Sequence, residues 1–145
     1  MPTISLTRLR LRSWRLVPAF APRAYRSAEQ ARRAAGYLDG AILADRGLTF
    51  WTLTAWTDAA ALHAYILAGD HRAAMAKLAA WCDEASVARW EAVDPGLPDW
   101  READRRMRAC GRPSKIRHPT PAHATLAYAA PRTTRGGRLP PRPPG

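Results

Sequence analysis

The feature that most constrains the fold is a change of hydrophobic period within one short segment. In residues 48–57, LTFWTLTAWT, successive residues alternate between two faces, as they do in a β-strand. One face carries aromatic and hydroxyl side chains: Phe50, Thr52, Thr54 and Trp56. Asp58 then begins an alanine-rich segment with helical spacing, and aspartate is a preferred helix N-cap. The segment therefore predicts a strand that leads directly into a helix.

The remaining patterns place this unit within a longer series of elements. Strand patterns cover residues 3–13, 37–45, 48–57 and 85–93, and helical patterns cover residues 19–34, 58–81 and 99–110. We expect Gly69 to break the second helix, with Asp70 capping its later piece, and Asp99 with Glu102 to form a capping box. The order β-α-β-β-α-β plus a C-terminal helix predicts an α+β, ferredoxin-like split βαβ fold.

Charge and composition divide the chain into two parts. The net charge is +11, but from Arg112 onward there are seven cationic residues and no acidic one. We therefore expect a folded domain over residues 1–111 and a basic, Pro/Arg-rich tail over residues 112–145 that is largely disordered, with residues 121–145 dispensable for folding. No apolar run approaches the ~20 residues of a membrane span, and we expect a cytoplasmic protein.

A four-stranded sheet with helices on one face leaves its other face bare. In the expected strands both faces are apolar, and the helices suffice to cover only one of them. Two such sheets can bury their bare faces against each other around a two-fold axis. The sequence therefore predicts a homodimer, as a dimeric α+β barrel.

The segment TFWTLTAWTDAAALHAY, followed by DHRAAM, resembles the strand-to-helix unit of the dimeric α+β barrel superfamily. That group includes antibiotic-biosynthesis-type and haem-degrading monooxygenases and, more distantly, spheroidene monooxygenase. The residues that carry the resemblance are Trp56, Asp58, Ala61, Leu62, Ala64, Tyr65 and His71. The resemblance implies a monooxygenase-like protein that acts on a small hydrophobic molecule, aromatic or polyene, in a barrel pocket. A non-catalytic ligand-binding or scaffolding member of the same fold is the alternative.

The same resemblance bears on cofactors. Quinone-forming relatives hold a flat phenolic substrate without metal or flavin, using an Asn where this chain has Thr52 and a Trp matched by Trp56. Haem-degrading relatives bind iron through a His where this chain has Met75 and Ala76, so no cofactor is predicted, although methionine can ligate haem. His63 and His71 lack the spacing of a helical metal pair, and no metal site is expected.

Each candidate site residue also has a structural interpretation. His71 and Tyr65 are the predicted catalytic residues, with His71 a neutral base at a helix start or simply a polar residue beside a cap. Predicted substrate-binding residues are Trp56, Thr52, Thr54, Phe50 and Arg10. Arg10 binds an anion if its strand face points into the pocket. If the strand instead lies at the edge of the sheet, Arg10 is an exposed charge that protects this edge from pairing with another strand. A nucleic-acid role for the basic tail belongs to another class, and we do not expect it because the chain has no reading motif.

Overall fold

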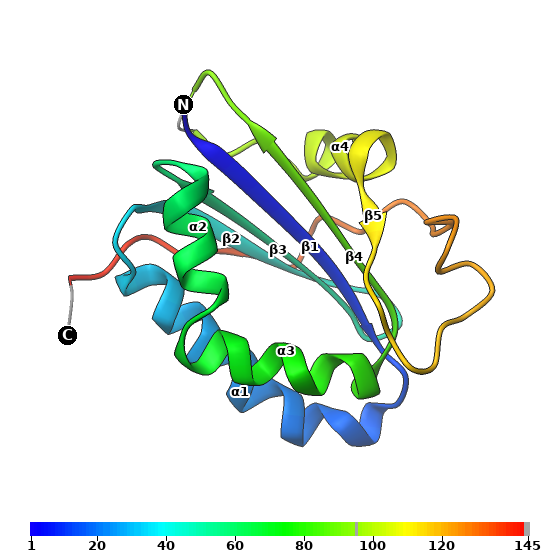
Figure 1. The fold of residues 1–145 in the computed structure, drawn as a ribbon. Helices are drawn as coiled ribbons and strands as arrows, with labels where there is room; N and C mark the ends of the chain where they lie inside the picture. Colours follow the sequence, from blue (N-terminus) through cyan, green and yellow to red (C-terminus); the bar gives the residue numbers. More distant parts are fainter. Residues whose placement is uncertain (95, 144–145) are drawn as a thin grey trace.

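The computed structural model describes residues 1–94 and 96–143, which form an antiparallel six-stranded sheet with helices on both faces (Figure 1). The strands are β1 (Thr3–Leu11), β2 (Tyr37–Asp45), β3 (Thr49–Trp56), β4 (Cys82–Glu91), β5 (Arg112–Pro113) and β6 (Gly136–Arg138). Their spatial order is β5-β4-β1-β3-β2-β6. The four central strands thus have the arrangement of a split βαβ unit, and the predicted ferredoxin-like fold is confirmed.

Three helices lie on one side of the sheet and one lies on the other (Figure 1). The first group is α1 (Val17–Arg33), preceded by the 3₁₀ turn η1 (Trp14–Leu16), then α2 (Ala59–Ile66) and α3 (Gly69–Trp81); α4 (Trp100–Cys110) lies opposite. Asp58 and Asp99 cap α2 and α4 by accepting hydrogen bonds from the backbone N–H groups of Ala61 and Glu102. These two helix starts follow the sequence prediction because an aspartate N-cap is a local signal.

The start of α3 differs from the prediction. Ala68 occupies the N-cap position without a side-chain hydrogen bond, and Asp70 lies inside the first turn. Gln30 on α1 takes over the capping: its side-chain oxygen accepts from the His71 N–H at 2.8 Å, and its side-chain nitrogen donates to the Ala68 carbonyl at 2.9 Å. Gly69 has a φ of +49°, which favours glycine at the sharp turn between α2 and α3.

The first strand is buried on both faces at its start, where Thr3 to Leu6 are all enclosed. This explains why the apolar parity of the sequence changes near Thr7. The register shift in this strand lies later, between Arg10 and Leu11 opposite β4. Ile4 and Leu6 face α4, whereas Leu9 packs in the cluster of Leu11 and the helices.

The C-terminal segment lies along the sheet, where we expected a largely disordered tail. Strand β6 pairs with β2, the Leu139 N–H donates to the Gly40 carbonyl at 2.8 Å, and Tyr128 packs against the main core cluster. Ion pairs join Arg138 to Asp39 and Arg142 to Glu29. Its Pro/Arg-rich sequence has no periodic apolar stripe, and one tyrosine, backbone pairing and paired arginines hold it in place.

The reason given for a homodimer does not hold in this structure. The sheet face opposite α1 and α3 is covered by α4 and by the segment that contains Tyr128. Core residues of this face such as Leu6, Trp51 and Leu53 are at most 1 % exposed within a single chain. In the part of the chain that the structure describes, this sheet face is therefore not left bare for a second sheet to cover.

Candidate functional site

The sheet face beneath α1, α2 and α3 changes character along the strands. Its middle carries hydroxyl residues that face one another across β1 and β3: Ser5 opposite Thr54, and Thr7 opposite Thr52. At one end lies Trp56, in a cluster with Tyr37 and Leu62, and at the other end Phe50 packs on Phe20 with ring centroids 5.1 Å apart. A polar centre therefore separates two apolar clusters.

An aromatic column rises from the first of these clusters. Tyr65 of α2 stacks on Trp56 with centroids 5.0 Å apart, and the His71 ring lies 4.5 Å from the Tyr65 ring. The Trp56 Nε1–H donates to the Thr54 hydroxyl at 2.9 Å, and the Tyr65 hydroxyl donates to the Ser27 carbonyl at 3.0 Å. Burial first, and then Tyr37, raises the pKa of Tyr65, so its phenol stays protonated.

The environment of His71 keeps its imidazole neutral. Burial is the largest cause and the positive charge of Arg89 the second, and together they lower the pKa of His71 from 6.5 to about 4. Because a neutral imidazole has one unprotonated ring nitrogen, His71 is able to accept a proton at neutral pH. This is the protonation state that the sequence analysis expected, although enclosure and Arg89 are the causes found here.

This shift predicts a pH dependence of stability. The unfolded chain takes up a proton near pH 6.5 and the folded chain only near pH 4, so protons favour unfolding. We expect His71 to remove up to about 3 kcal/mol of stability as the pH falls through that window, with no further loss below it. Urea denaturation of wild type and His71→Gln across the window measures the effect, and the exposed His63→Gln is the control. Equal pH slopes for wild type and His71→Gln would contradict the shift.

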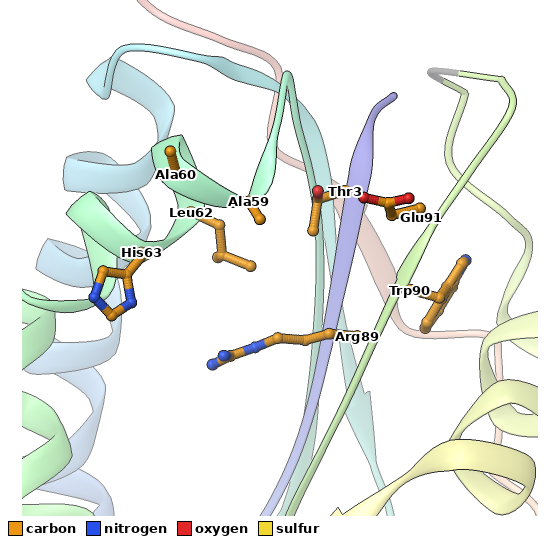
Figure 2. A pocket seen from close by; sticks show the side chains of 8 residues that line it. All are labelled: Thr3, Ala59, Ala60, Leu62, His63, Arg89, Trp90 and Glu91. Carbon is orange, nitrogen blue, oxygen red and sulfur yellow. The ribbon is translucent and has the colours of Figure 1, made fainter.

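A cleft of about 480 Å³ opens beside the column, between the first turns of α2 and the ends of β1 and β4 (Figure 2). Leu62 lines it and also belongs to the cluster of Trp56. Arg89 extends from β4 toward α2 and His63 (Figure 2), and among the described residues it has no carboxylate within ion-pair distance. Thr3, at the cleft wall, is 5 % exposed, and its hydroxyl has no hydrogen-bond partner within the described chain. The cleft thus presents the guanidinium of Arg89 and the carboxylate of Glu91, whereas the Thr3 hydroxyl is buried in its wall.

The structure brings together four of the seven predicted site residues. Trp56, Tyr65, His71 and Thr54 meet in the aromatic column. Thr52 lies in the next row of the sheet, and Phe50 lies in the other apolar cluster. Trp56 is 0 % exposed, so it supports the cleft from behind rather than forming its surface.

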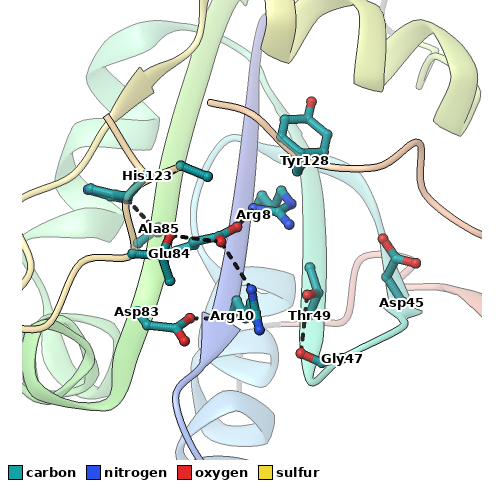
Figure 3. Close-up of polar contacts among 12 residues, drawn as sticks. Arg8, Arg10, Asp45, Gly47, Thr49, Asp83, Glu84, Ala85, His123 and Tyr128 are labelled. Atoms are coloured by element: carbon teal, nitrogen blue, oxygen red, sulfur yellow. Dashed lines mark hydrogen bonds and ion pairs between the residues drawn. The ribbon is translucent and has the colours of Figure 1, made fainter. Parts of the chain in front are cut away.

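Arg10, the predicted anion clamp, lies on the opposite face of the sheet (Figure 3). Its Nη1 donates to Glu84 at 3.1 Å, and its Nε lies 3.7 Å from Asp83. These carboxylates occupy its guanidinium, so Arg10 takes no part in the cleft. Strand alternation alone did not tell which of the two faces would meet α1 and α3.

Arg89, Thr3 and Gln30 are the residues that sequence reasoning missed. Arg89 lies on the same face of β4 as Val87, and the alternation in residues 85–93 predicts this shared face. No sequence signal marked Thr3 or Gln30, because their roles depend on contacts with distant elements.

Within residues 1–94 and 96–143, no group of three or more His, Cys, Asp or Glu side chains is close enough to hold a metal ion. Met75, which stands where haem-degrading relatives carry their ligand, is 45 % exposed on the surface of α3.

A protein-family model of a domain of unknown function, DUF3291, matches residues 15–130. The chain belongs to the DUF3291 family. The match includes α1 to α4 and continues through Tyr128, so the segment that covers the second sheet face lies mostly within the family domain. No protein with a curated description matches the sequence.

Solved structures with the same fold include several oxygenases. A variant of SnoaB, a cofactor-independent oxygenase from Streptomyces nogalater, has a TM-score of 0.55 at 17% identity, covering 68% of this chain and 98% of its own. A structure described as an antibiotic biosynthesis monooxygenase has a TM-score of 0.57 at 16% identity, covering 65% and 100%. Rv0793 from Mycobacterium tuberculosis has a TM-score of 0.58 at 12% identity, covering 65% and 97%.

These likenesses confirm, at the level of fold, the resemblance drawn from the sequence. They leave about a third of this DUF3291 chain without a counterpart, since each covers less than 70% of it. In the part of the chain that the structure describes, no helix has the length and apolar character needed to cross a membrane.

Proposed function

We propose that this DUF3291 protein binds a small, largely aromatic molecule with an anionic oxygen in the cleft and oxygenates it without metal or flavin. The observation that carries the proposal is the cleft with the unpaired Arg89 in its wall. His71 does not line this cleft but stacks on Tyr65 in the adjoining aromatic column, and the charge of Arg89 contributes to lowering its pKa. The resemblance to quinone-forming monooxygenases and the fold shared with a cofactor-independent oxygenase support this class of reaction.

In the proposed reaction Arg89 binds the substrate oxyanion and His71 removes a proton from an activated methylene of the same molecule. The oxyanion neutralises the guanidinium, and because that charge lowers the pKa of His71, binding makes His71 a stronger base. The resulting carbanion gives electrons to dioxygen. One oxygen atom becomes the new carbonyl and the other leaves as water with the two methylene hydrogens, so no external reductant is needed.

The remaining residues have supporting roles in this proposal. Leu62 forms the apolar wall, and Trp56 with Tyr65 holds α2 and His71 in place. A cytoplasmic location belongs to the same proposal, supported by the free thiols of Cys82 and Cys110.

The test uses dithranol, a dihydroxyanthrone, as probe. We expect Arg89→Gln to raise the Kd of dithranol about tenfold to hundredfold, because a charge-assisted contact is lost. Binding is followed by quenching of tryptophan fluorescence, and turnover by oxygen consumption above the protein-free rate. Arg101→Gln, an exposed arginine of α4, is the matched control.

Two outcomes separate the proposal from its alternative. Binding that depends on Arg89 without oxygen consumption would favour the non-catalytic ligand-binding protein. Equal affinity in wild type and Arg89→Gln would contradict the assignment of the cleft.

A further inference from the structure

The second face of the sheet has the composition of a protein core. It carries Ile4, Leu6, Leu43, Trp51, Leu53, Ala55 and Ala88, all at most 2 % exposed. These residues come from all four central strands, so the apolar surface runs across the whole sheet. Without a cover, an apolar surface of this extent would bind another apolar surface.

The cover comes from the same chain. Ala103 and Met107 of α4 lie in the cluster at 0 % exposure, above β1 and β4. Tyr128 meets Trp51 edge to face, with ring centroids 5.6 Å apart. A Cβ atom at Gly136 would lie 3.1 Å from the Trp100 Nε1 atom, so the backbone of β6 runs close to α4.

Polar contacts fix this cover in place (Figure 3). The buried Arg8 guanidinium lies 4.3 Å from the Tyr128 ring centroid, and Arg108 lies 4.1 Å from the same ring. Arg8 Nη1 donates to Glu84 at 2.8 Å, and Glu84 also accepts from the Thr120 hydroxyl at 3.0 Å. The Tyr128 hydroxyl donates to Asp104 at 2.7 Å. Buried polar contacts of this kind favour one arrangement of the segment, although the Nε of Arg8 has no partner among the described residues.

We infer that α4 and residues 120–139 occupy the sheet face that a second copy would cover, and that the protein is a monomer. A second sheet reaches Leu6 or Leu53 only by displacing Met107 and Tyr128, and a stable interface needs about 800 Å² from each partner. The cleft on the other face is then complete within one chain. The inference does not rest on the proposed reaction.

Sedimentation equilibrium of the full chain at micromolar concentrations tests the inference directly. We expect the mass of one chain, 16.0 kDa, at every concentration. A mass of two chains would overturn it, whether the sheets pack face to face or the C-terminal segments exchange.

A second measurement tests the cover itself. Tyr128→Ala should expose part of the apolar face and increase the fluorescence of the dye ANS several-fold, whereas Tyr25→Ala, which alters an exposed tyrosine of α1, should not. Tyr128→Phe keeps the ring over Trp51 and serves if Tyr128→Ala does not fold. If Tyr128→Ala does not fold, hydrogen exchange of the wild-type chain is measured as well. Backbone amides of residues 120–139 that exchange as fast as those of an unfolded peptide would overturn the inference. Unchanged dye binding and stability in folded Tyr128→Ala would do the same.

Discussion

Replacing Glu84 by glutamine is expected to lower the free energy of unfolding by about 3–5 kcal/mol, because it leaves the Arg8 guanidinium buried without a counter-ion. Glu84 is 6 % exposed and receives hydrogen bonds from Arg8, Arg10 and Thr120. Burial alone would raise the pKa of Glu84, but the bonds from Arg8 and Thr120 outweigh it and lower that pKa. The carboxylate therefore stabilises the fold above its unfolded-state pKa, and this stabilisation is lost as the pH falls through the folded-state pKa.

The matched control is Glu102→Gln on the exposed side of α4. Glu102 also binds two arginines, Arg105 and Arg106, but in contact with solvent. Solvent screens exposed ion pairs of this kind, so they contribute little to stability. Urea denaturation at neutral pH measures both variants, and a loss below about 1 kcal/mol for Glu84→Gln would show that Arg8 needs no buried partner.

Local signals predicted most of the fold. Alternation gave the four long strands, and aspartate N-caps gave the starts of α2 and α4. The change of apolar parity in β1 was compatible with a bulge or with burial on both faces, and its central place between β3 and β4 accounts for the burial on both faces that the structure shows. The cover of the second face was missed because its contacts are scattered: one tyrosine, one glycine backbone and stacked arginines leave no periodic pattern.

The site was predicted only where neighbouring residues in the sequence stay together. Trp56, Tyr65 and His71 belong to one continuous strand–helix unit, and they meet in space. Arg10 and Arg89 come from other strands, and their faces depend on which side α1 and α3 cover. The residue pattern of β1 is compatible with either orientation of its faces. Only the ion pairs of Arg10 with Glu84 and Asp83 show on which face of the sheet Arg10 lies.

His71→Gln is expected to slow oxygen consumption with dithranol by about 10²–10⁴, the usual contribution of a general base. The substitution removes the proton-accepting nitrogen and keeps the backbone N–H that Gln30 binds. Dithranol affinity should stay within about threefold of wild type, since Arg89 and Leu62 still form the cleft. His118→Gln, which alters an exposed histidine that does not line the cleft, is the control, and it should keep most of the wild-type rate.

The pH profile distinguishes a base from a residue that only fills space. In wild type kcat/KM should be constant near neutral pH and fall by half near pH 4, because protonated His71 accepts no proton. Circular dichroism at each pH separates this fall from unfolding, which the same protonation promotes. The residual activity of His71→Gln should not show this fall in kcat/KM near pH 4. Wild-type turnover by His71→Gln would mean that His71 only packs on Tyr65, and that the proton goes elsewhere.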